Sequence, residues 1–329
     1  MRKGRRAYSG AASSENRDSW NLSERISAFT FLSTFYEDCF LLKIAIAVAL
    51  KKSNKGENTV FLRATAEQSS FFTRKEIHMT LTRFQLKILA ICSMFLDHAM
   101  KIFEDVLEPA MGQTLYTAVL SLGRMAFLIF AFQLAEGVWH THNVKAYLKR
   151  LFGFALLAEI PFQMVKSLIL TGEITLSFGL TNVMMTLFLG VLSCVAYAFS
   201  AQKDRRDMGK FAVFVIALLA EIMGTDYGAF GVVFVFVLWY TWHSPQRWRA
   251  MFWMILFYYG LWIPLALLSW GITFAAVFES FMYLAVSLGT WALLRRYKGE
   301  VGQKGGIYAF YLFYPVHLLC LAGAYCLVM

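Results

Sequence analysis

From residue 84 onward, the chain is a succession of apolar runs, most of them about 20 residues long, separated by short polar loops. A helix of that length spans the hydrocarbon core of a bilayer, which is roughly 30 Å thick. The alternating ten-residue segments that are typical of a transmembrane β-barrel do not occur. The sequence therefore predicts an all-α, polytopic integral membrane protein, a helical bundle with about nine transmembrane helices.

The composition agrees with this prediction. The chain is 58% hydrophobic and 16% charged, whereas a soluble domain is about 25% charged. Its net charge of +10 would also suit a nucleic-acid-binding protein, but the basic residues lie in short loops between apolar runs, as membrane topology requires. We therefore expect lipid, and no nucleic acid, as a partner. The cysteines form no CxxC pair, so we expect neither a metal site nor a disulfide framework.

The spans are expected at residues 84–103, 115–137, 146–169, 177–200, 211–224, 227–242, 250–269, 272–294 and 307–328. Basic loops alternate along the chain with acidic or uncharged ones. Because Lys and Arg mark the cytoplasmic side, we predict a multi-pass protein of the plasma (inner) membrane with the Met79 side cytoplasmic and the C-terminus extracytoplasmic. There is no internal repeat, which argues against a transporter because many transporters have paired halves.

Residues 1–78 differ from the remainder, which we treat as one transmembrane domain over 79–329. Their single apolar run, 27–50, is interrupted by three charged residues, and each charge near a bilayer centre costs about 2.5–3.5 kcal/mol. Two of the three are acids, which also argues against a signal peptide. Because Met79 opens a segment that resembles a natural start, we expect 1–78 to be a poorly ordered or non-native extension.

Ionisable residues inside the predicted spans are the candidates for chemistry, because such residues usually face a cavity or a partner. Asp97 and His98 lie in the first span, and a His near a carboxylate suits general base catalysis. Adjacent helical residues point about 100° apart, so each needs a partner from another helix. The alternative is that Asp97 pairs with Lys101 one turn later and that His98 forms only local hydrogen bonds.

Three more of the ionisable residues within spans are candidates for the site. Arg124 in the second span requires an anion, which is either a ligand's phosphate or carboxylate, or the carboxylate of Asp97 or Glu159. Glu159 precedes Pro161, where a proline loosens the helix, and a kink with a fully hydrogen-bonded Glu is the structural alternative. His317 follows a Tyr-Pro pair in the last span, and catalytic and structural roles for it remain equally open.

A series of short phrases in order over about 84–320 resembles the TraX family of conjugation-associated membrane proteins. The phrases are LKI at 86–88, MFLDH at 94–98, GRMAF at 123–127, FAF at 130–132, AEG at 135–137, YLKRL at 147–151, EIPF at 159–162, Asn182 with TL at 186–187, DYG at 226–228 and FYPVHL at 313–318. One departure is Leu128, where the family pattern leads us to expect Pro. Residues 1–78 match no part of the pattern.

That resemblance implies an acetyltransferase that uses acetyl-CoA, because the family is linked to N-terminal acetylation of conjugative pilin and is similar to membrane acyltransferases that acetylate surface sugars. Acetyl-CoA would bind the basic cytoplasmic face, and the acceptor would be a pilin N-terminus or a cell-surface glycan. We assign donor binding to His140, Asn143, Lys149 and Arg150, and acceptor binding to Asn182 and Asp226. The alternative function is a non-enzymatic transporter or scaffold with a polar path through the membrane.

In the catalytic hypothesis, His98 or His317 removes the acceptor's proton, and Arg124 holds the thioester or stabilises its oxyanion. All three would share one water-accessible cavity with Asp97, Glu159 and Asn182. We expect these residues to face the interior of the bundle, because each charge would cost several kcal/mol if it faced lipid.

Overall fold

The computed structural model describes residues 81–175, 179–268, 273–297, 299 and 307–328. These residues form an all-helical bundle, and the described part of the chain contains no strand, only a single bridge between Leu81 and Tyr297. The predicted extension over 1–78 and the start at Met79 lie outside the described residues.

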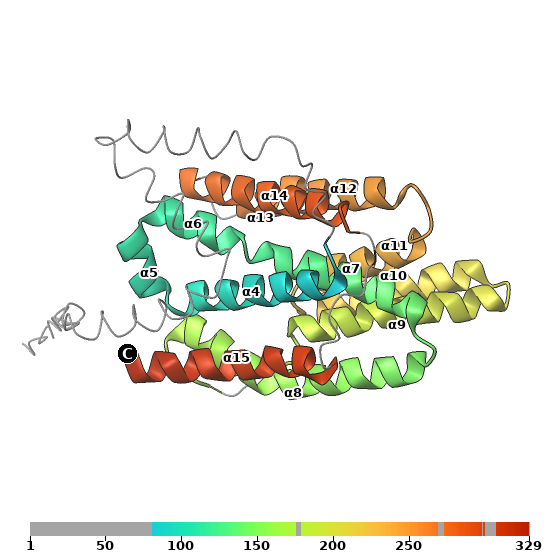
Figure 1. Cartoon of the computed structure of the whole chain (residues 1–329), viewed down its shortest axis with the longest axis horizontal. Coiled ribbons are helices and arrows are strands. Elements are labelled where there is room, and N and C mark those ends of the chain that lie inside the picture. Colours follow the sequence, from blue (N-terminus) through green and yellow to red (C-terminus); the bar gives the residue numbers. More distant parts are fainter. Residues whose placement is uncertain (1–80, 176–178, 269–272, 298, 300–306, 329) are drawn as a thin grey trace, which may run out of the picture.

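Most of the helices run along the longest axis of the molecule (Figure 1). Their bounds are α4 Arg83–Ile102, α5 Glu104–Met111, α6 Gln113–Ser121, α7 Arg124–His140, α8 Val144–Thr171, α9 Val183–Gln202, α10 Arg206–Ile222, α11 Gly228–Tyr240, α12 Arg247–Phe257, the π-helix η1 Tyr258–Trp262, α13 Ile263–Leu268, α14 Phe274–Leu294 and α15 Ile307–Val328. The C-terminus lies at the same end of the bundle as α5 (Figure 1).

Five helical segments in the described ranges are long and apolar enough to cross a membrane. They are Gln113–His140, Val144–Thr171, Val183–Gln202, Phe274–Leu294 and Tyr308–Val328. The predicted count of about nine spans is therefore not confirmed. The remaining predicted spans do form helices, but α4 carries several charged residues and α10, α11 and α12 have 17, 13 and 11 residues.

The structure corrects one expectation about the region after α4 and refines another. The acidic segment expected as a loop forms α5, whose first turn carries Glu104 and Asp105, where acidic side chains interact favourably with the helix dipole. The second predicted span, 115–137, lies within the membrane-crossing segment Gln113–His140, in which a turn at Leu122–Gly123 separates α6 from α7.

Local sequence signals explain where several helices begin. Thr82 caps α4 in a capping box with Gln85, and this reciprocal pairing satisfies two backbone N–H groups that the first turn leaves free. Asn143 caps α8 through the Ala146 N–H, and Asn182 caps α9 through the Met185 N–H. The two asparagines that had been assigned to ligand binding therefore serve as helix caps.

Helices α4 and α7 pack against each other at the centre of the bundle, with α15 and α8 on one side and α14 and α11 on the other (Figure 1). Large apolar side chains are exposed on the outer helices, including Leu157 on α8, Phe214 on α10, Trp253 on α12 and Phe281 on α14. An exposed apolar surface of this extent indicates contact with a membrane or another protein. Because several of the helices are long enough to cross a bilayer, we assign this surface to lipid. The molecule is a helical membrane protein.

Candidate functional site

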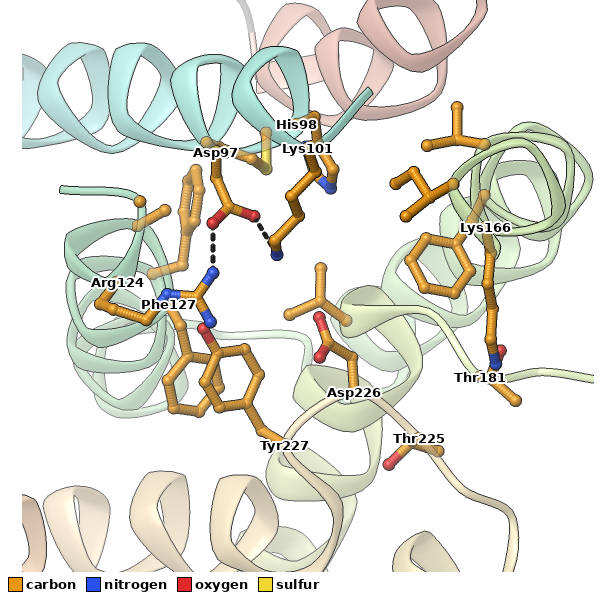
Figure 2. Close-up of a pocket in the computed structure, with 18 of the residues that line it drawn as sticks. Asp97, His98, Lys101, Arg124, Phe127, Lys166, Thr181, Thr225, Asp226 and Tyr227 are labelled. Carbon is orange, nitrogen blue, oxygen red and sulfur yellow. Dashed lines mark hydrogen bonds and ion pairs between the residues drawn. The ribbon is translucent and has the colours of Figure 1, made fainter. Parts of the chain in front are cut away.

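A cavity of about 420 Å³ opens where several helix ends meet near Asp97. It lies between the C-terminal parts of α4 and α8, the beginnings of α7 and α9, and the turn that joins α10 to α11. Figure 2 shows its polar side chains, and we call it the Asp97 cavity. Its charged and titratable lining residues are Asp97, His98, Lys101, Arg124, Lys166, Asp226 and Tyr227.

Asp97 is at the centre of an ion-pair network in this cavity. Its Oδ2 accepts a hydrogen bond from Lys101 Nζ at 2.7 Å, and its Oδ1 accepts one from an Arg124 amino group. Both contacts are visible in Figure 2. The structure thus contains the two pairings that the sequence left open for Asp97. The Arg124 side chain also lines the cavity, and its Nε is buried without a hydrogen-bond partner among the described residues.

The break between α6 and α7 brings Arg124 to this position. A Cβ atom on Gly123 would lie 2.4 Å from both Cβ and Oδ1 of Asp97, so only glycine permits the backbone of the break to approach α4 so closely. Arg124 is consequently the first residue of α7, in the interior of the membrane-crossing segment Gln113–His140.

His98 and His317 form a hydrogen-bonded pair between α4 and α15. Nδ1 of His317 lies 2.8 Å from the carbonyl oxygen of Phe313, which can only accept, so this nitrogen carries the proton. In a neutral His317 ring, Nε2 then accepts from His98 Nδ1, 3.0 Å away. The lone pair of neutral His98 is left on Nε2. His98 lines the Asp97 cavity, whereas His317 lies behind it.

Glu159 and Asn182 belong to a separate cluster at the α8–α9 junction. The Glu159 carboxylate accepts hydrogen bonds from the backbone N–H groups of Thr181 and Asn182, at 3.0 and 3.3 Å, and from the side chains of Gln163 and Asn182. The Asn182 amide also donates to the Ala155 carbonyl at 2.8 Å. Neither residue lines the Asp97 cavity, although their neighbour Thr181 does.

The turn at 224–228 supplies the wall of the Asp97 cavity opposite α4. The Asp226 N–H donates to the Thr181 carbonyl at 2.7 Å, and the Asp226 carbonyl accepts from Thr186, while the carboxylate faces the cavity (Figure 2). Tyr227 has a φ of +67°, a conformation that costs a non-glycine residue of the order of 1–3 kcal/mol and is concentrated at functional sites. Its ring stacks on Phe127 at 3.8 Å between centroids.

A second cavity, of about 350 Å³, occupies the other half of the bundle. We call it the Arg83 cavity, and its charged and titratable lining residues are Arg83, Lys87, Glu136, His140, Tyr147, Arg150, Tyr311 and Tyr314. Arg83 pairs with Glu136 at 3.0 Å, and Glu136 also accepts from the Tyr297 hydroxyl at 2.9 Å. Among the described residues, neither Lys87 nor Arg150 forms an ion pair, so the cavity keeps cationic groups for an anionic ligand.

The predicted site residues fall into three groups. Asp97, His98, Arg124 and Asp226 line the Asp97 cavity, and His317 adjoins it through His98. His140 and Arg150 line the Arg83 cavity. Glu159, Asn182, Asn143 and Lys149 line neither cavity.

Sequence reasoning missed four basic lining residues. They are Arg83, Lys87, Lys101 and Lys166. All four lie within or next to predicted spans. A Lys or Arg in an apolar run was therefore the sequence signal that could have identified them as lining residues. Lys101 had been considered only as a partner of Asp97. Within the described ranges, no three His, Cys, Asp or Glu side chains come together as metal ligands would.

Comparison with known proteins places the chain in a family. The family model described as TraX protein matches residues 82–324. The chain is also 29% identical, over 260 residues, to a protein described as probable fimbrial assembly protein FimC, serogroup H1, from Dichelobacter nodosus. That alignment covers 75% of this chain and 97% of the relative. No solved structure matches the chain significantly. Because this family model matches well over half of the chain, the chain belongs to the TraX family.

Proposed function

We propose that this protein is a membrane-embedded acetyltransferase that moves an acetyl group from acetyl-CoA to a pilin N-terminus or a cell-surface glycan during fimbria or pilus assembly. The observation that carries the proposal is the His98–His317 pair, which leaves a basic ring nitrogen on a residue that lines the Asp97 cavity. The name of the relative, a fimbrial assembly protein, supports the link to fimbriae.

The Arg83 cavity is our candidate for the donor site. Lys87 and Arg150 offer positive charge without a paired carboxylate among the described residues, which suits the phosphates of a nucleotide-bearing thioester. A volume of about 350 Å³ is at the small end of ligand pockets. We therefore place the thioester-bearing arm inside and the phosphates at Lys87 and Arg150, with the nucleoside at the mouth near His140, Asn143 and Lys149.

The Asp97 cavity is our candidate for the reaction centre. His98 Nε2 accepts the proton of the acceptor's N–H or O–H as that nitrogen or oxygen attacks the thioester carbonyl carbon. Arg124, whose guanidinium lines this cavity, stabilises the negative charge that develops on the thioester oxygen. The carbon–sulfur bond then breaks, and the sulfur leaves with the proton from His98. The products are the acetylated acceptor and the thiol of CoA.

Four of the predicted site residues take structural roles in this proposal. Glu159 and Asn182 join α8 to α9 through their shared hydrogen bonds, which positions Thr181 and the turn at Asp226. Asp97 holds Arg124 and Lys101 in place rather than contacting the acceptor. His317 acts as a positioning residue that keeps the His98 proton on Nδ1.

A third cavity favours an acceptor that approaches through the membrane. It has a volume of about 810 Å³ and shares Gly224, Thr225 and Tyr227 with the Asp97 cavity. Its other walls are largely aromatic, and Trp253 and Trp262 on its rim are 63% and 55% exposed. An acceptor with an apolar body could lie against this wall and present its reactive group to Asp226 and His98.

The proposed chemistry is tested by the release of CoA thiol from acetyl-CoA. The purified full-length chain in lipid nanodiscs is expected to release thiol only when an acceptor is present, for example a pilin-type peptide with a free amino terminus or a surface glycan. The same peptide with a blocked amino terminus is the matched control. If no acceptor supports thiol release while the protein moves solutes across a vesicle membrane, the transporter alternative is correct instead.

We further propose that the Arg83 cavity opens to the cytoplasm and the Asp97 cavity lies toward the outside of the plasma membrane. The basis is the alternation of loop charges. Reporter fusions after Glu108 and Glu173 are then expected to read as extracytoplasmic, and fusions after Lys145 and Arg206 as cytoplasmic. A cytoplasmic signal at Glu108 and Glu173 would contradict this orientation.

A further inference from the structure

The two cavities meet at a narrow apolar seam. Met94, Phe130 and Val183 are the residues that line both of them, and each comes from a different helix, namely α4, α7 and α9. None of the three side chains offers a strong hydrogen-bond donor or acceptor. The seam therefore places three apolar side chains between two cavities that each carry charged groups.

The cavities lie in line along α4. Arg83, Lys87, Met94, His98 and Lys101 line one cavity or the other, and their spacing of three, four or seven residues puts them on one helix face. With a rise of 1.5 Å per residue, Lys87 and His98 are about 16 Å apart along the axis. Met94, one turn before His98, lies between them. A donor anchored near Lys87 must therefore extend past Met94 to reach His98.

We propose that the seam of Met94, Phe130 and Val183 is the passage through which the acyl-bearing arm of the donor reaches His98. This inference rests on the proposed acetyltransferase function. Met94 is 7% exposed, and the flexible thioether of methionine can change rotamer to admit a slender chain. When no arm occupies it, the apolar ring keeps the donor compartment apart from the reaction centre, which protects a thioester from water.

The seam separates two measurable events, because the donor can bind the Arg83 cavity without passing Met94, whereas acetyl transfer requires passage. Val183→Trp fills the seam. We expect this variant to retain CoA binding through Lys87 and Arg150 and to transfer acetyl groups about 100-fold more slowly, as misplacement of a reacting group does. Val215→Trp is the matched control, because Val215 on α10 is 44% exposed and lines neither cavity.

A second variant closes the seam after folding. Val183→Cys is small enough to fold as the parent does, and it is then alkylated with a bulky thiol reagent. The unsubstituted protein treated with the same reagent controls for its own cysteines. Transfer should be lost on alkylation of Val183→Cys while CoA binding persists.

The outcomes distinguish the seam from the function on which it rests. If the unsubstituted protein neither binds CoA nor transfers acetyl groups, the proposed function fails and the seam proposal falls with it. If that protein is active but the tryptophan and alkylated variants are equally active, the seam is not the passage. If both variants lose CoA binding as well as acetyl transfer, the proposal is also overturned, because the seam would then be part of the donor site.

Discussion

Replacement of His98 by Ala is expected to lower the rate of acetyl transfer by about 100-fold or more while the protein accumulates normally in the membrane. General base catalysis contributes about 10²–10⁴-fold to a reaction, and His98 carries the basic nitrogen in the Asp97 cavity. The rate is measured as release of CoA thiol, with the amount of membrane protein determined in parallel. His243→Ala is the matched control, because His243 is exposed and lines neither cavity.

His317 gives this prediction a second readout. His317→Gln retains a polar side chain but cannot reproduce the ring-to-ring hydrogen bond at 3.0 Å. The rate is expected to fall less than in His98→Ala, and its pH profile is expected to shift because the proton of His98 is no longer held on Nδ1. Full activity of His98→Ala at normal protein levels would show that the catalytic assignment is wrong.

Replacement of Asp97 by Ala should have the largest effect on stability. Its carboxylate pairs with both Lys101 and Arg124, and the side chains of Arg124 and Asp97 are only 15% and 11% exposed. Removing one partner of a buried ion pair leaves the other charge without compensation and costs about 3–5 kcal/mol. We expect Asp97→Ala to lower the unfolding temperature in detergent and the amount of protein in the membrane.

A double substitution separates the charge effect from simple loss of packing. Asp97→Ala with Arg124→Ala removes both charges, so it is expected to be less destabilised than the sum of the two single variants. Asp207→Ala is the control, because Asp207 pairs with Lys210 at 2.9 Å on the exposed surface, where an ion pair contributes little. An Asp97→Ala protein as stable as its parent would contradict the assigned role of this network.

The helical boundaries were largely predictable from the sequence. The predicted spans 84–103, 272–294 and 307–328 match α4, α14 and α15 to within two residues. Apolar runs and capping residues act over a few consecutive positions, so a single chain reveals them. The turn at Leu122–Gly123 was missed because the helices on both sides of it are apolar. At this turn Gly123 lies against Asp97 on another helix, and such a contact is not visible in the sequence.

The candidate site was predictable only in part. Asp97, His98, Arg124 and His317 stood out because charged or titratable groups are rare in apolar spans, whereas Asp226 was selected through the family phrase at 226–228. The structure brings these five residues together. Their partners could not be read from spacing. Arg124 had two candidate carboxylates, and the structure pairs it with Asp97 while Glu159 bonds to the α8–α9 junction.

Hydropathy is a property of consecutive residues, and for this reason the sequence by itself determined that the chain is helical, lies in a membrane and carries a small set of intramembrane polar groups. Cavities depend instead on which helix faces meet, and those faces come from segments far apart in the chain. His98 and His317 are 219 positions apart. Only the tertiary structure decided that these two histidines form a hydrogen bond. It also decided that Met94, Phe130 and Val183 lie between the Asp97 cavity and the Arg83 cavity.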